Sequence, residues 1–572
     1  MKTRLTALKK DFFSLSLPTR WCVLLCFVLL FLHSTILLLG SPDRSYDAWI
    51  HLFFGSHWQE SWWNDIEPRW FGGFSVFSYP PFAHQLLALA GFLLPWNLAY
   101  SLIQTLTLVG LCTGIYRYSR IWFNQEVSAL AALLSLASGS VAMTVHLFGQ
   151  YPNTLSLALL FHLLPWAWIW VRQGEKNALG KVFLLFIPLV CTSLFSNLFG
   201  LALFALPVML KSFQIQNRDT QKAIFKRWIG LVLGLVLLGG VFMLPLFWYL
   251  QHYPFQQVPI PHGSRNNMLR FTETNYYLFY GLYGPFIVFF PVFLGYMIRK
   301  KKHIEFLPTF IVFFLLGLGG AFPPNQWLPA RLFYILTFDR FCLWNSLLLT
   351  PLAAYLLFEL WALLPRAKRL AGISLILAGG LYALWFSVNL TSPFWRRQVP
   401  PQVFQQTLAF LAKEEVKKTR FASLGLGAHN FSRLSALSQA QTLDGAYYFG
   451  RRILEMNQVA MGMLDESKYY GPVAMNVLTQ ILTAPEKYHL RYILVLDHFY
   501  DLALETAGWI PKETLDGKIQ VWTPSHPISD QPAPSLNPAP LNLRLLWGIL
   551  PLGAFTWLLL LQLKKARKTS VS

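Results

Sequence analysis

Charge is scarce in this chain of 572 residues, because Asp, Glu, Lys and Arg together make up only 13% of it. A soluble protein carries about twice that fraction, so the composition argues against a soluble enzyme. Acidic residues are the rarer kind, with 26 Asp and Glu against 47 Lys and Arg. Hydrophobic residues fill 55% of the chain and aromatic residues 16%, which is typical of a membrane protein.

Cysteine is also scarce, and its placement excludes two kinds of site. All five cysteines lie in or beside apolar runs, none has the spacing of a zinc site, and the polar segment near the C-terminus has none. We therefore predict neither a zinc site nor a disulfide framework. The first apolar run is not followed by a small-residue cleavage site, which predicts a permanent first span rather than a cleaved signal.

The net charge of +21 raises the question of nucleic-acid binding. The basic residues do not form one stripe, however. They fall in short blocks between apolar runs, at 2–10, 211–227, 299–302, 366–369 and 564–568. Such blocks are typical of the cytoplasmic ends of membrane spans. We therefore predict no nucleic-acid partner.

Apolar runs long enough to cross a membrane recur along the first 390 residues and once more near the C-terminus. The clear ones are 21–40, 97–117, 126–145, 154–172, 227–250, 277–298, 304–321, 341–364, 369–390 and 543–563. Residues 81–95 are short and bounded by prolines, whereas residues 180–211 are too long for one span and contain a polar break. All basic blocks become cytoplasmic if 81–95 lies on the outer surface and 180–211 forms a hairpin of two short spans.

The predicted fold class is an α-helical polytopic membrane protein of about 12 transmembrane helices, with a small extracytoplasmic α/β domain. We place the multi-span domain at 1–390, the α/β domain with a proline-rich linker at 391–540, and the last span with its basic tail at 541–572. Residues 421–426 and 491–496 have the pattern of buried strands. The charge pattern predicts a multi-pass protein of the plasma (inner) membrane with both termini cytoplasmic.

The most informative polar segment is the first loop, residues 41–82, which follows the first span. It is long and rich in carboxylates, histidines and tryptophans, whereas a mere connector is short. Asp47 and His51 lie four residues apart, which places them on one face of a helix. Asp47 is therefore a candidate catalytic group or metal ligand, the alternative being the cap of a short helix. The tryptophans form either an interfacial belt or a sugar platform.

Other polar residues gather in the loops predicted on the same outer face. Arginine binds phosphate through two parallel hydrogen bonds, so these loops indicate a site for an anionic, phosphate-bearing substrate. The candidate substrate-binding residues are Arg265, Arg270, Arg331, Arg340, Asp339, His146, Gln150, Asn153 and Tyr79. For Asp339 and Arg340, a plain ion pair at the end of a span is the alternative.

Three motifs carry a resemblance to a known family: Asp47-x-x-x-His51, Pro68-Arg69-Trp70-Phe71-Gly72-Gly73 and Tyr79-Pro80-Pro81-Phe82. They resemble the GT-C membrane glycosyltransferases, and most of all the bacterial branch labelled 6-pyruvoyl-tetrahydropterin synthase-related membrane proteins. The resemblance implies a polyprenyl-phosphate-linked sugar donor and a first-loop acid, here Asp47, that binds a metal or activates the acceptor. This chain departs from the pattern in its next outer loop, 146–153, which has no second carboxylate.

The function predicted from these observations and this resemblance is transfer of a hexosyl or pentosyl group from a polyprenyl-phosphate-linked donor to a glycan, lipid or protein acceptor. It would take place on the extracytoplasmic face of the cell envelope, with membrane lipid as a further partner. Asp47 would be the base or metal ligand beside His51, and a divalent metal ion is a candidate cofactor. A transporter or lipid-linked glycan flippase, and a non-catalytic scaffold of the same fold, are the alternatives. A transporter should show internal symmetry, and we find no repeat.

Overall fold

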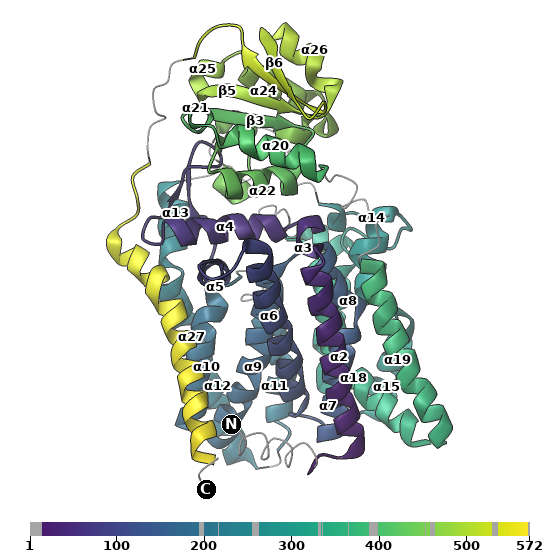
Figure 1. Cartoon of the computed structure of the whole chain (residues 1–572). Coiled ribbons are helices and arrows are strands. Elements are labelled where there is room, and N and C mark those ends of the chain that lie inside the picture. The colour runs from purple at the N-terminus through teal and green to yellow at the C-terminus, as the bar shows by residue number, and fades with distance from the viewer. Residues whose placement is uncertain are drawn as a thin grey trace.

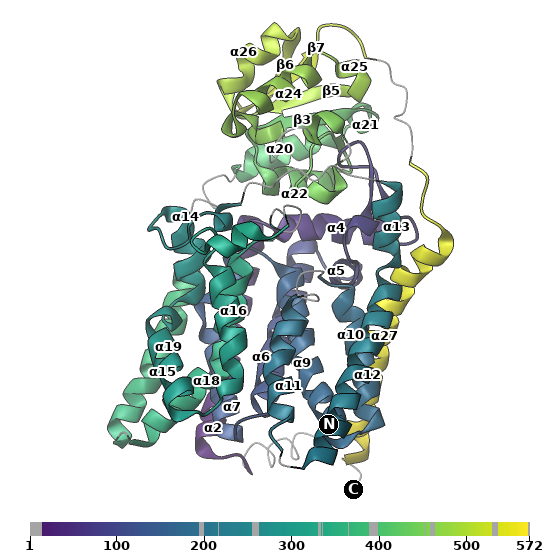
Figure 2. The ribbon, with the colours of Figure 1, turned by 180° about the vertical axis from the view of Figure 1, so that it is seen from behind.

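The protein is a bundle of long helices that carries an α/β domain on one end (Figure 1). The computed structural model describes residues 14–193, 199–215, 217–253, 262–329, 333, 336–363, 365–387, 399–451, 453–457, 464–528 and 536–569. We call the end that carries the α/β domain the domain end, and the other the far end. The first helix, α2 (Leu17–Leu38), starts at the far end, and the last, α27 (Leu541–Thr569), returns there along the side of the bundle (Figures 1 and 2).

Seven helical stretches are long and apolar enough to cross a membrane in the described part of the chain. They are α2, α6 (Trp96–Ser119), α9 (Tyr151–Gln173), α12 (Arg218–Phe242), the run Glu273–Lys300 that ends in α15 (Phe286–Lys300), α18 (Asp339–Leu363) and α27. The helix α7 (Gln125–Ala137) and the stretch Gly139–Leu147 make an eighth if they count as one span, bent by 45°. Ser138 lies at the bend and its side chain accepts a hydrogen bond from the Val141 N–H, which starts a new helix there. The polytopic fold is thus confirmed, and the count of about 12 stays a prediction.

Shorter helices account for the two regions whose path the sequence left open. α5 (Phe82–Gly91) has ten residues, too few to cross a membrane. It lies beside α4 (Ala48–Glu60), which runs across the domain end (Figure 1). Leu87 of α5 and Trp96 of α6 both pack on Gly55 of α4, so α6 starts at the same end. The region 180–211 contains two short helices, α10 (Lys176–Val190) and α11 (Leu201–Ser212).

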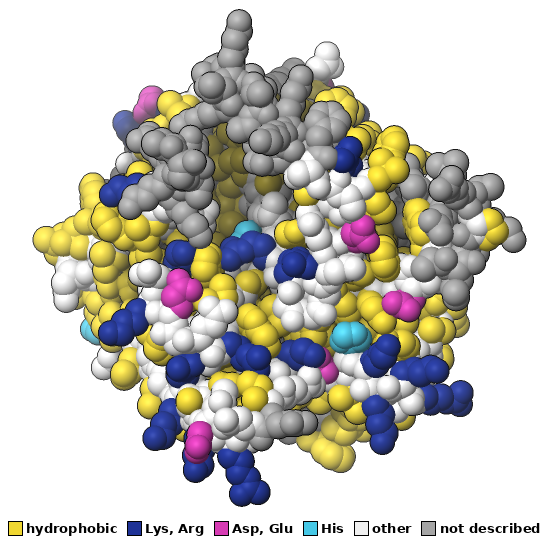
Figure 3. All heavy atoms as spheres, turned by 90° about the horizontal axis from the view of Figure 1, so that it is seen from below, with side chains coloured by type: hydrophobic (Ala, Val, Ile, Leu, Met, Phe, Trp, Pro, Cys, Tyr) yellow, Lys and Arg dark blue, Asp and Glu magenta, His cyan; other side chains and the backbone are white. Residues whose placement is uncertain are grey.

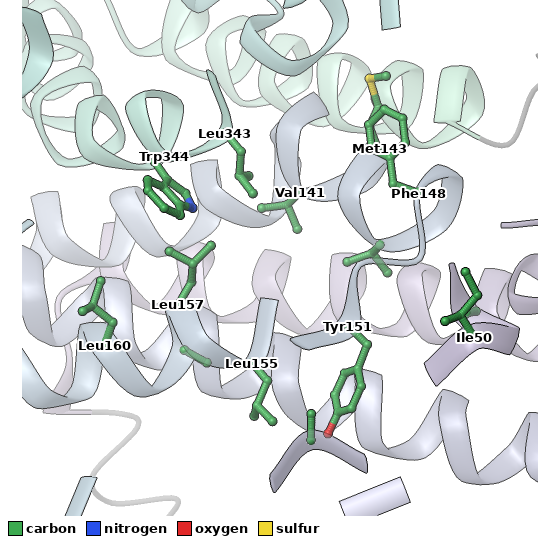
Figure 4. Close-up of a cluster of buried hydrophobic side chains, with 14 of the residues drawn as sticks. Ile50, Val141, Met143, Phe148, Tyr151, Leu155, Leu157, Leu160, Leu343 and Trp344 are labelled. Carbon is green, nitrogen blue, oxygen red and sulfur yellow. The ribbon is translucent and has the colours of Figure 1, made fainter. Parts of the chain in front are cut away.

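The remaining helices of the bundle surround this group. They include α13 (Leu244–His252), α16 (Leu307–Gly317) and α19 (Arg366–Ser387). Apolar side chains from several elements pack beneath the domain end (Figure 4). The residues labelled there are Ile50, Val141, Met143, Phe148, Tyr151, Leu155, Leu157, Leu160, Leu343 and Trp344. This core joins α4, α9 and α18, so that the start of α4 rests on a close-packed support.

The α/β domain is built on a five-stranded sheet with strand order β4-β3-β5-β7-β6. The strands are β3 (Arg420–Leu424), β4 (Gln441–Thr442), β5 (Leu490–Val495), β6 (Trp509–Leu515) and β7 (Ile519–Pro524). β3 pairs with β4 and β5 in parallel, and every residue of β3 is buried. The two strands expected at 421–426 and 491–496 are therefore present as β3 and β5.

The α/β domain sits directly on the first loop. Its helix α22 (Ala428–Ser438) packs along α4, and the guanidinium of Arg433 lies over the ring of Trp49 at 5.2 Å from the ring centroid. The Tyr447 hydroxyl donates to the Ser78 carbonyl at 2.7 Å, and the Thr442 N–H donates to the Arg69 carbonyl, also at 2.7 Å. The domain thereby covers the segment in which the sequence places the catalytic residues.

Candidate functional site

The backbone around Asp47 is held by the segment that ends the bent helix pair. This segment is a π-helical turn, η2 (Met143–Leu147), whose last carbonyls accept the N–H groups of Tyr46 and Asp47 at 3.0 and 2.9 Å. Gly149 follows with φ +66°, and a Cβ there would lie 2.5 Å from the Ser45 Oγ. Only glycine permits so close an approach. Asp47 is thus fixed in place just before α4 begins.

The Asp47 carboxylate has no partner of its own. In the described part of the chain it accepts no hydrogen bond and forms no ion pair, and its side chain is partly exposed. Burial by the surrounding protein raises the pKa of Asp47 to about 7, although the Arg340 guanidinium lowers it and the Asp339 carboxylate adds to the rise. A carboxylate with a pKa near neutral, whose oxygens are open, is suited to accept a proton from a bound hydroxyl.

Arg340 and Asp339 bring the start of α18 to this carboxylate, although almost 300 residues separate them from it in the sequence. The charge of Arg340 also lowers the pKa values of His51 and Tyr79, so one guanidinium acts on the whole group. Asp339 is buried, and its Oδ1 lies 4.0 Å from the Nε2 of His262. The structure therefore gathers five residues that the sequence proposed: Asp47, His51, Tyr79, Asp339 and Arg340.

His51 belongs to a buried pair of histidines. Its Nδ1 lies 3.3 Å from the Nε2 of His84, whose ring stacks on Phe54 and meets Tyr79 edge-on. Burial, together with the charge of Arg340, lowers the pKa of His51 to about 3, so this imidazole is neutral at physiological pH. His84 was not among the proposed site residues, although it follows Tyr79 by only five positions.

The α/β domain contributes a tyrosine next to the group. The ring centroid of Tyr447 lies 5.1 Å from that of Tyr79 and 5.2 Å from that of Phe54. Burial raises the pKa of Tyr79 to about 12, with Arg340 lowering it and Asp47 raising it. Sequence reasoning missed Tyr447, because nothing near it in the chain signals a contact with a loop almost 370 residues earlier.

His146 requires a correction, because it binds protein rather than facing the site. It is fully buried, and its Nε2 lies 2.8 Å from the Nδ1 of His33 on α2. Its Nδ1 lies 3.1 Å from the Ser41 Oγ, and the Nε2 of His33 lies 3.0 Å from the Leu136 carbonyl. One tautomer of each ring satisfies all three bonds, so both imidazoles are used in fixing α2 against η2.

Three other proposed ligands also serve the protein itself. Arg265 donates its Nε–H to the carbonyls of Phe333 and Leu336 at 3.1 and 3.2 Å, so this donor is used within the protein, and phosphate binding by Arg265 stays a prediction. Asn153 accepts the indole N–H of Trp344 at 3.5 Å and donates to the Gln150 Oε1 at 3.3 Å. These contacts orient the helix ends around the site.

Of the two remaining arginines, Arg270 stands apart from the group. Arg270 is exposed, and its charge is not among those that act on Asp47, His51 or Tyr79. Arg331 lies outside the described residues.

A second cluster of charged groups lies in the same first loop. The Arg69 guanidinium binds Glu67 through two hydrogen bonds of 2.8 and 2.6 Å and donates to the Ser56 Oγ at 2.9 Å. The Nδ1 of His57 lies 3.0 Å from the other side of the Glu67 carboxylate. Burial alone would raise the pKa of Glu67, but Arg69 and His57 outweigh it and lower the pKa to about 2. We call Glu67, Arg69 and His57 the clasp.

Asp65 is likewise a structural residue. It is buried, and its two oxygens accept from the Ser75 hydroxyl at 2.6 Å and from the Ala539 N–H at 2.8 Å. The second bond ties the first loop to the chain just before α27. Asp65 is therefore more than the turn residue that its place before Pro68 suggests.

The acidic and histidine side chains near Asp47 decide whether this site could hold a metal ion. Among the described residues, no three His, Cys, Asp or Glu side chains come together in a way that could hold a metal ion. Asp47 and Asp339 are two carboxylates with an arginine beside them, and the guanidinium supplies positive charge at the place where a metal would. The residues do not fit a metal cage, so the chemistry proposed below runs through the chain's own groups.

Comparison with known families identifies the chain. Residues 77–390, more than half of it, match the model of the 6-pyruvoyl-tetrahydropterin synthase related domain, a membrane protein. The chain belongs to this family. No curated protein matches it.

Solved structures with the same fold are GT-C membrane glycosyltransferases. ArnT from Cupriavidus metallidurans bound to undecaprenyl phosphate is 13% identical, with a TM-score of 0.53, and the match covers 88% of this chain and 98% of that one. Its apo state gives 12% identity and a TM-score of 0.54, over 89% and 98% of the two chains. The arabinofuranosyltransferase AftD from Mycobacteria gives 14% and 0.50, with 90% of this chain covering 42% of that one. At these identities the likeness establishes the fold, which confirms the resemblance inferred from the first-loop motifs.

Proposed function

We propose that this protein transfers a sugar from a polyprenyl-phosphate-linked donor to a hydroxyl acceptor at the domain end of the bundle, on the extracytoplasmic face. The observation that carries the proposal is Asp47, an open carboxylate with a pKa near 7 that the fold holds within reach of the Arg340 charge. In the clasp, by contrast, the Glu67 carboxylate is held by two hydrogen bonds from Arg69. The undecaprenyl phosphate bound to a protein of the same fold supports the donor class.

The chemistry divides between the two groups. Asp47 accepts the proton of the acceptor hydroxyl while the hydroxyl oxygen forms a bond to the anomeric carbon of the sugar. The bond between that carbon and the phosphate oxygen breaks, and the electron pair leaves with the polyprenyl phosphate. Arg340 stabilises the negative charge that the phosphate gains, through its paired N–H donors. Asp339 lies next to Arg340 in the sequence, and its carboxylate raises the pKa of Asp47.

Histidine and tyrosine side chains next to Asp47 form the walls of the proposed site and exclude water from it. His51 lies one turn along α4, and together with His84 of α5 it gives a polar but uncharged wall. The rings of Tyr79 and Tyr447 lie side by side at a tilt of 56°, and aromatic faces of this kind pack well on the apolar face of a sugar. Because Tyr447 comes from the α/β domain, the acceptor would bind between this domain and the first loop. Metal binding by Asp47 remains a separate prediction, which added chelator tests.

The proposed function is tested with the purified full chain in lipid nanodiscs. Undecaprenyl-phosphate-linked hexoses and pentoses are supplied with a small alcohol as acceptor, and the release of undecaprenyl phosphate is measured. We expect release that Asp47→Asn abolishes. Transport of intact donor across a proteoliposome membrane without cleavage would instead favour the flippase. Failure to bind undecaprenyl phosphate would favour the scaffold.

A further inference from the structure

Two cations and a tryptophan meet on the side of the bundle, where α6, α9 and α10 pack together. The Arg117 Cζ lies 4.8 Å from the ring centroid of Trp166, and the Lys181 Nζ lies 3.7 Å from the same centroid. Arg117 comes from α6, Trp166 from α9 and Lys181 from α10. One aromatic ring therefore brings together two like charges from the two helices that flank α9. We call these three residues the Trp166 site.

The neighbours of Arg117 bring no negative charge. The Nε2 of His162 lies 3.0 Å from the Gly110 carbonyl, so it carries the hydrogen of that bond. The Nδ1 then accepts from the Arg117 Nη1 at 2.9 Å, which fits a neutral imidazole. In the part of the chain that the structure describes, no carboxylate pairs with Arg117. Its charge is thus left for a partner outside the protein.

The Trp166 site faces lipid. On α6 the side chains of Leu102, Leu106 and Val109 are exposed at helical spacing, and Arg117 lies further along the same side. An exposed apolar row on a spanning helix faces the hydrocarbon. Arg117 lies two residues before the end of α6, at the far end of the bundle. This is the depth of lipid headgroups, where Trp, Lys and Arg concentrate.

We propose that the Trp166 site binds the phosphate of an anionic glycerophospholipid in the leaflet at the far end. Two like charges beside one ring repel each other, and an anion bound close to both offsets that repulsion. Basic surfaces between membrane helices at this level bind anionic headgroups. Figure 3 shows Lys and Arg side chains spread over the far end, which would concentrate anionic lipid around the bundle. This inference does not depend on the proposed transfer reaction.

The test counts lipids retained by the full chain. The protein is reconstituted in mixed phosphatidylglycerol and phosphatidylcholine, extracted, and weighed by native mass spectrometry with its bound lipids. We expect the wild type to retain phosphatidylglycerol and the double variant Arg117→Gln/Lys181→Gln to retain one molecule fewer. Lys181→Gln alone should weaken retention severalfold, and it keeps the proposal testable if loss of Arg117 disturbs folding. Trp166→Phe keeps the ring and should retain the lipid.

The matched control is Lys222→Gln, a well-exposed cation at the same end that pairs with Asp219 at 3.6 Å. It should leave retention unchanged. Equal retention by the wild type and by a monodisperse Lys181→Gln variant would overturn the proposal, as would equal retention of the two lipids by the wild type. Displacement of the lipid by millimolar inorganic phosphate would assign the site to free phosphate instead.

Discussion

The first loop contains two groups of acidic, basic and histidine residues, and they differ in how far the protein satisfies them. In the clasp, both oxygens of Glu67 are bonded to Arg69, and one also to His57, all three side chains being buried. In the Asp47 group, the carboxylate accepts no hydrogen bond from the described residues and stays partly exposed, while Arg340 acts on it from another helix. The first group has the geometry of a structural ion pair. The second group has the geometry of a binding site.

The pKa values show the same contrast. Partners drive the pKa of Glu67 down to about 2 despite burial, whereas burial drives that of Asp47 up to about 7 because its partners are too weak to oppose it. A perturbed pKa marks a functional site only when geometry excludes a structural ion pair. Changing each carboxylate to its amide therefore separates the two roles.

Asp47→Asn should have the largest effect on activity. The amide keeps the shape and removes the proton acceptor, so we expect sugar transfer to fall by about 10²–10⁴ while folding and donor binding stay intact. Transfer from the undecaprenyl-phosphate donor, together with size-exclusion profiles, gives the measurement. Asp65→Asn is the control for loss of a first-loop carboxylate, and it should lower thermal stability before it lowers turnover. Full activity of Asp47→Asn would remove Asp47 from the site.

Glu67→Gln should have the largest effect on stability. It removes the charge that binds the buried Arg69 guanidinium and leaves that guanidinium with the exposed Glu60 carboxylate at 4.0 Å, which costs about 3–5 kcal/mol. The lowered pKa of Glu67 means that its contribution is present above about pH 4.5 and is lost as the pH falls toward 2. Thermal melting followed by fluorescence-detected chromatography measures the loss. The double variant Glu67→Gln/Arg69→Met should recover part of it, and a stable single variant would show that the clasp is dispensable.

Arg340→Ala should weaken binding of undecaprenyl phosphate by about 10- to 100-fold, the value of one or two charge-assisted hydrogen bonds. Arg340→Lys should restore only part of it, because an ammonium keeps the charge and loses the paired donors. Arg270→Ala is the matched control, an exposed arginine at the same end with no effect on Asp47. Calorimetry or native mass spectrometry reports the affinities. An equal loss of affinity in Arg340→Ala and Arg270→Ala would mean that the donor is attracted by the overall positive charge of the domain end and not by a specific site at Arg340.

Gly149→Ala should have a smaller effect, through the position of Asp47. The added methyl group would meet the Ser45 side chain and the Ala48 backbone, so Asp47 must shift by a few tenths of an ångström. We expect a roughly tenfold loss of kcat with little change in donor affinity, since orientation dominates such steps. A matched loss of donor affinity would indicate general unfolding of the loop instead.

The sequence predicted one half of the Asp47 group better than the other. Asp47 and His51 were found because their spacing is local and lies on one helical turn. Arg340 could be proposed only as one of four outer arginines, since no pattern in one sequence tells which of them meets α4. His146 was misassigned for the same reason. A histidine near an outer loop has the same sequence signature whether it faces substrate or, as here, His33 and Ser41.

The fold shows the same division between local and distant information. Hydrophobic periodicity located the long spans and the two parallel strands β3 and β5. It could not reveal that Tyr447 reaches Ser78 and Tyr79, or that Ala539 binds Asp65. Such contacts depend on how separate elements pack, and packing has no signature in a single segment.

The pH dependence of transfer tests the central claim most directly, because it depends on the charges around Asp47. If Asp47 must be ionised, kcat/KM should rise about tenfold per pH unit and level off near pH 7. Arg340 lowers the pKa of Asp47 and Asp339 raises it. Arg340→Gln should therefore move the rise to higher pH, and Asp339→Asn should move it to lower pH. Opposite shifts in the two variants would support the account. A flat wild-type profile, or shifts in the same direction, would contradict it.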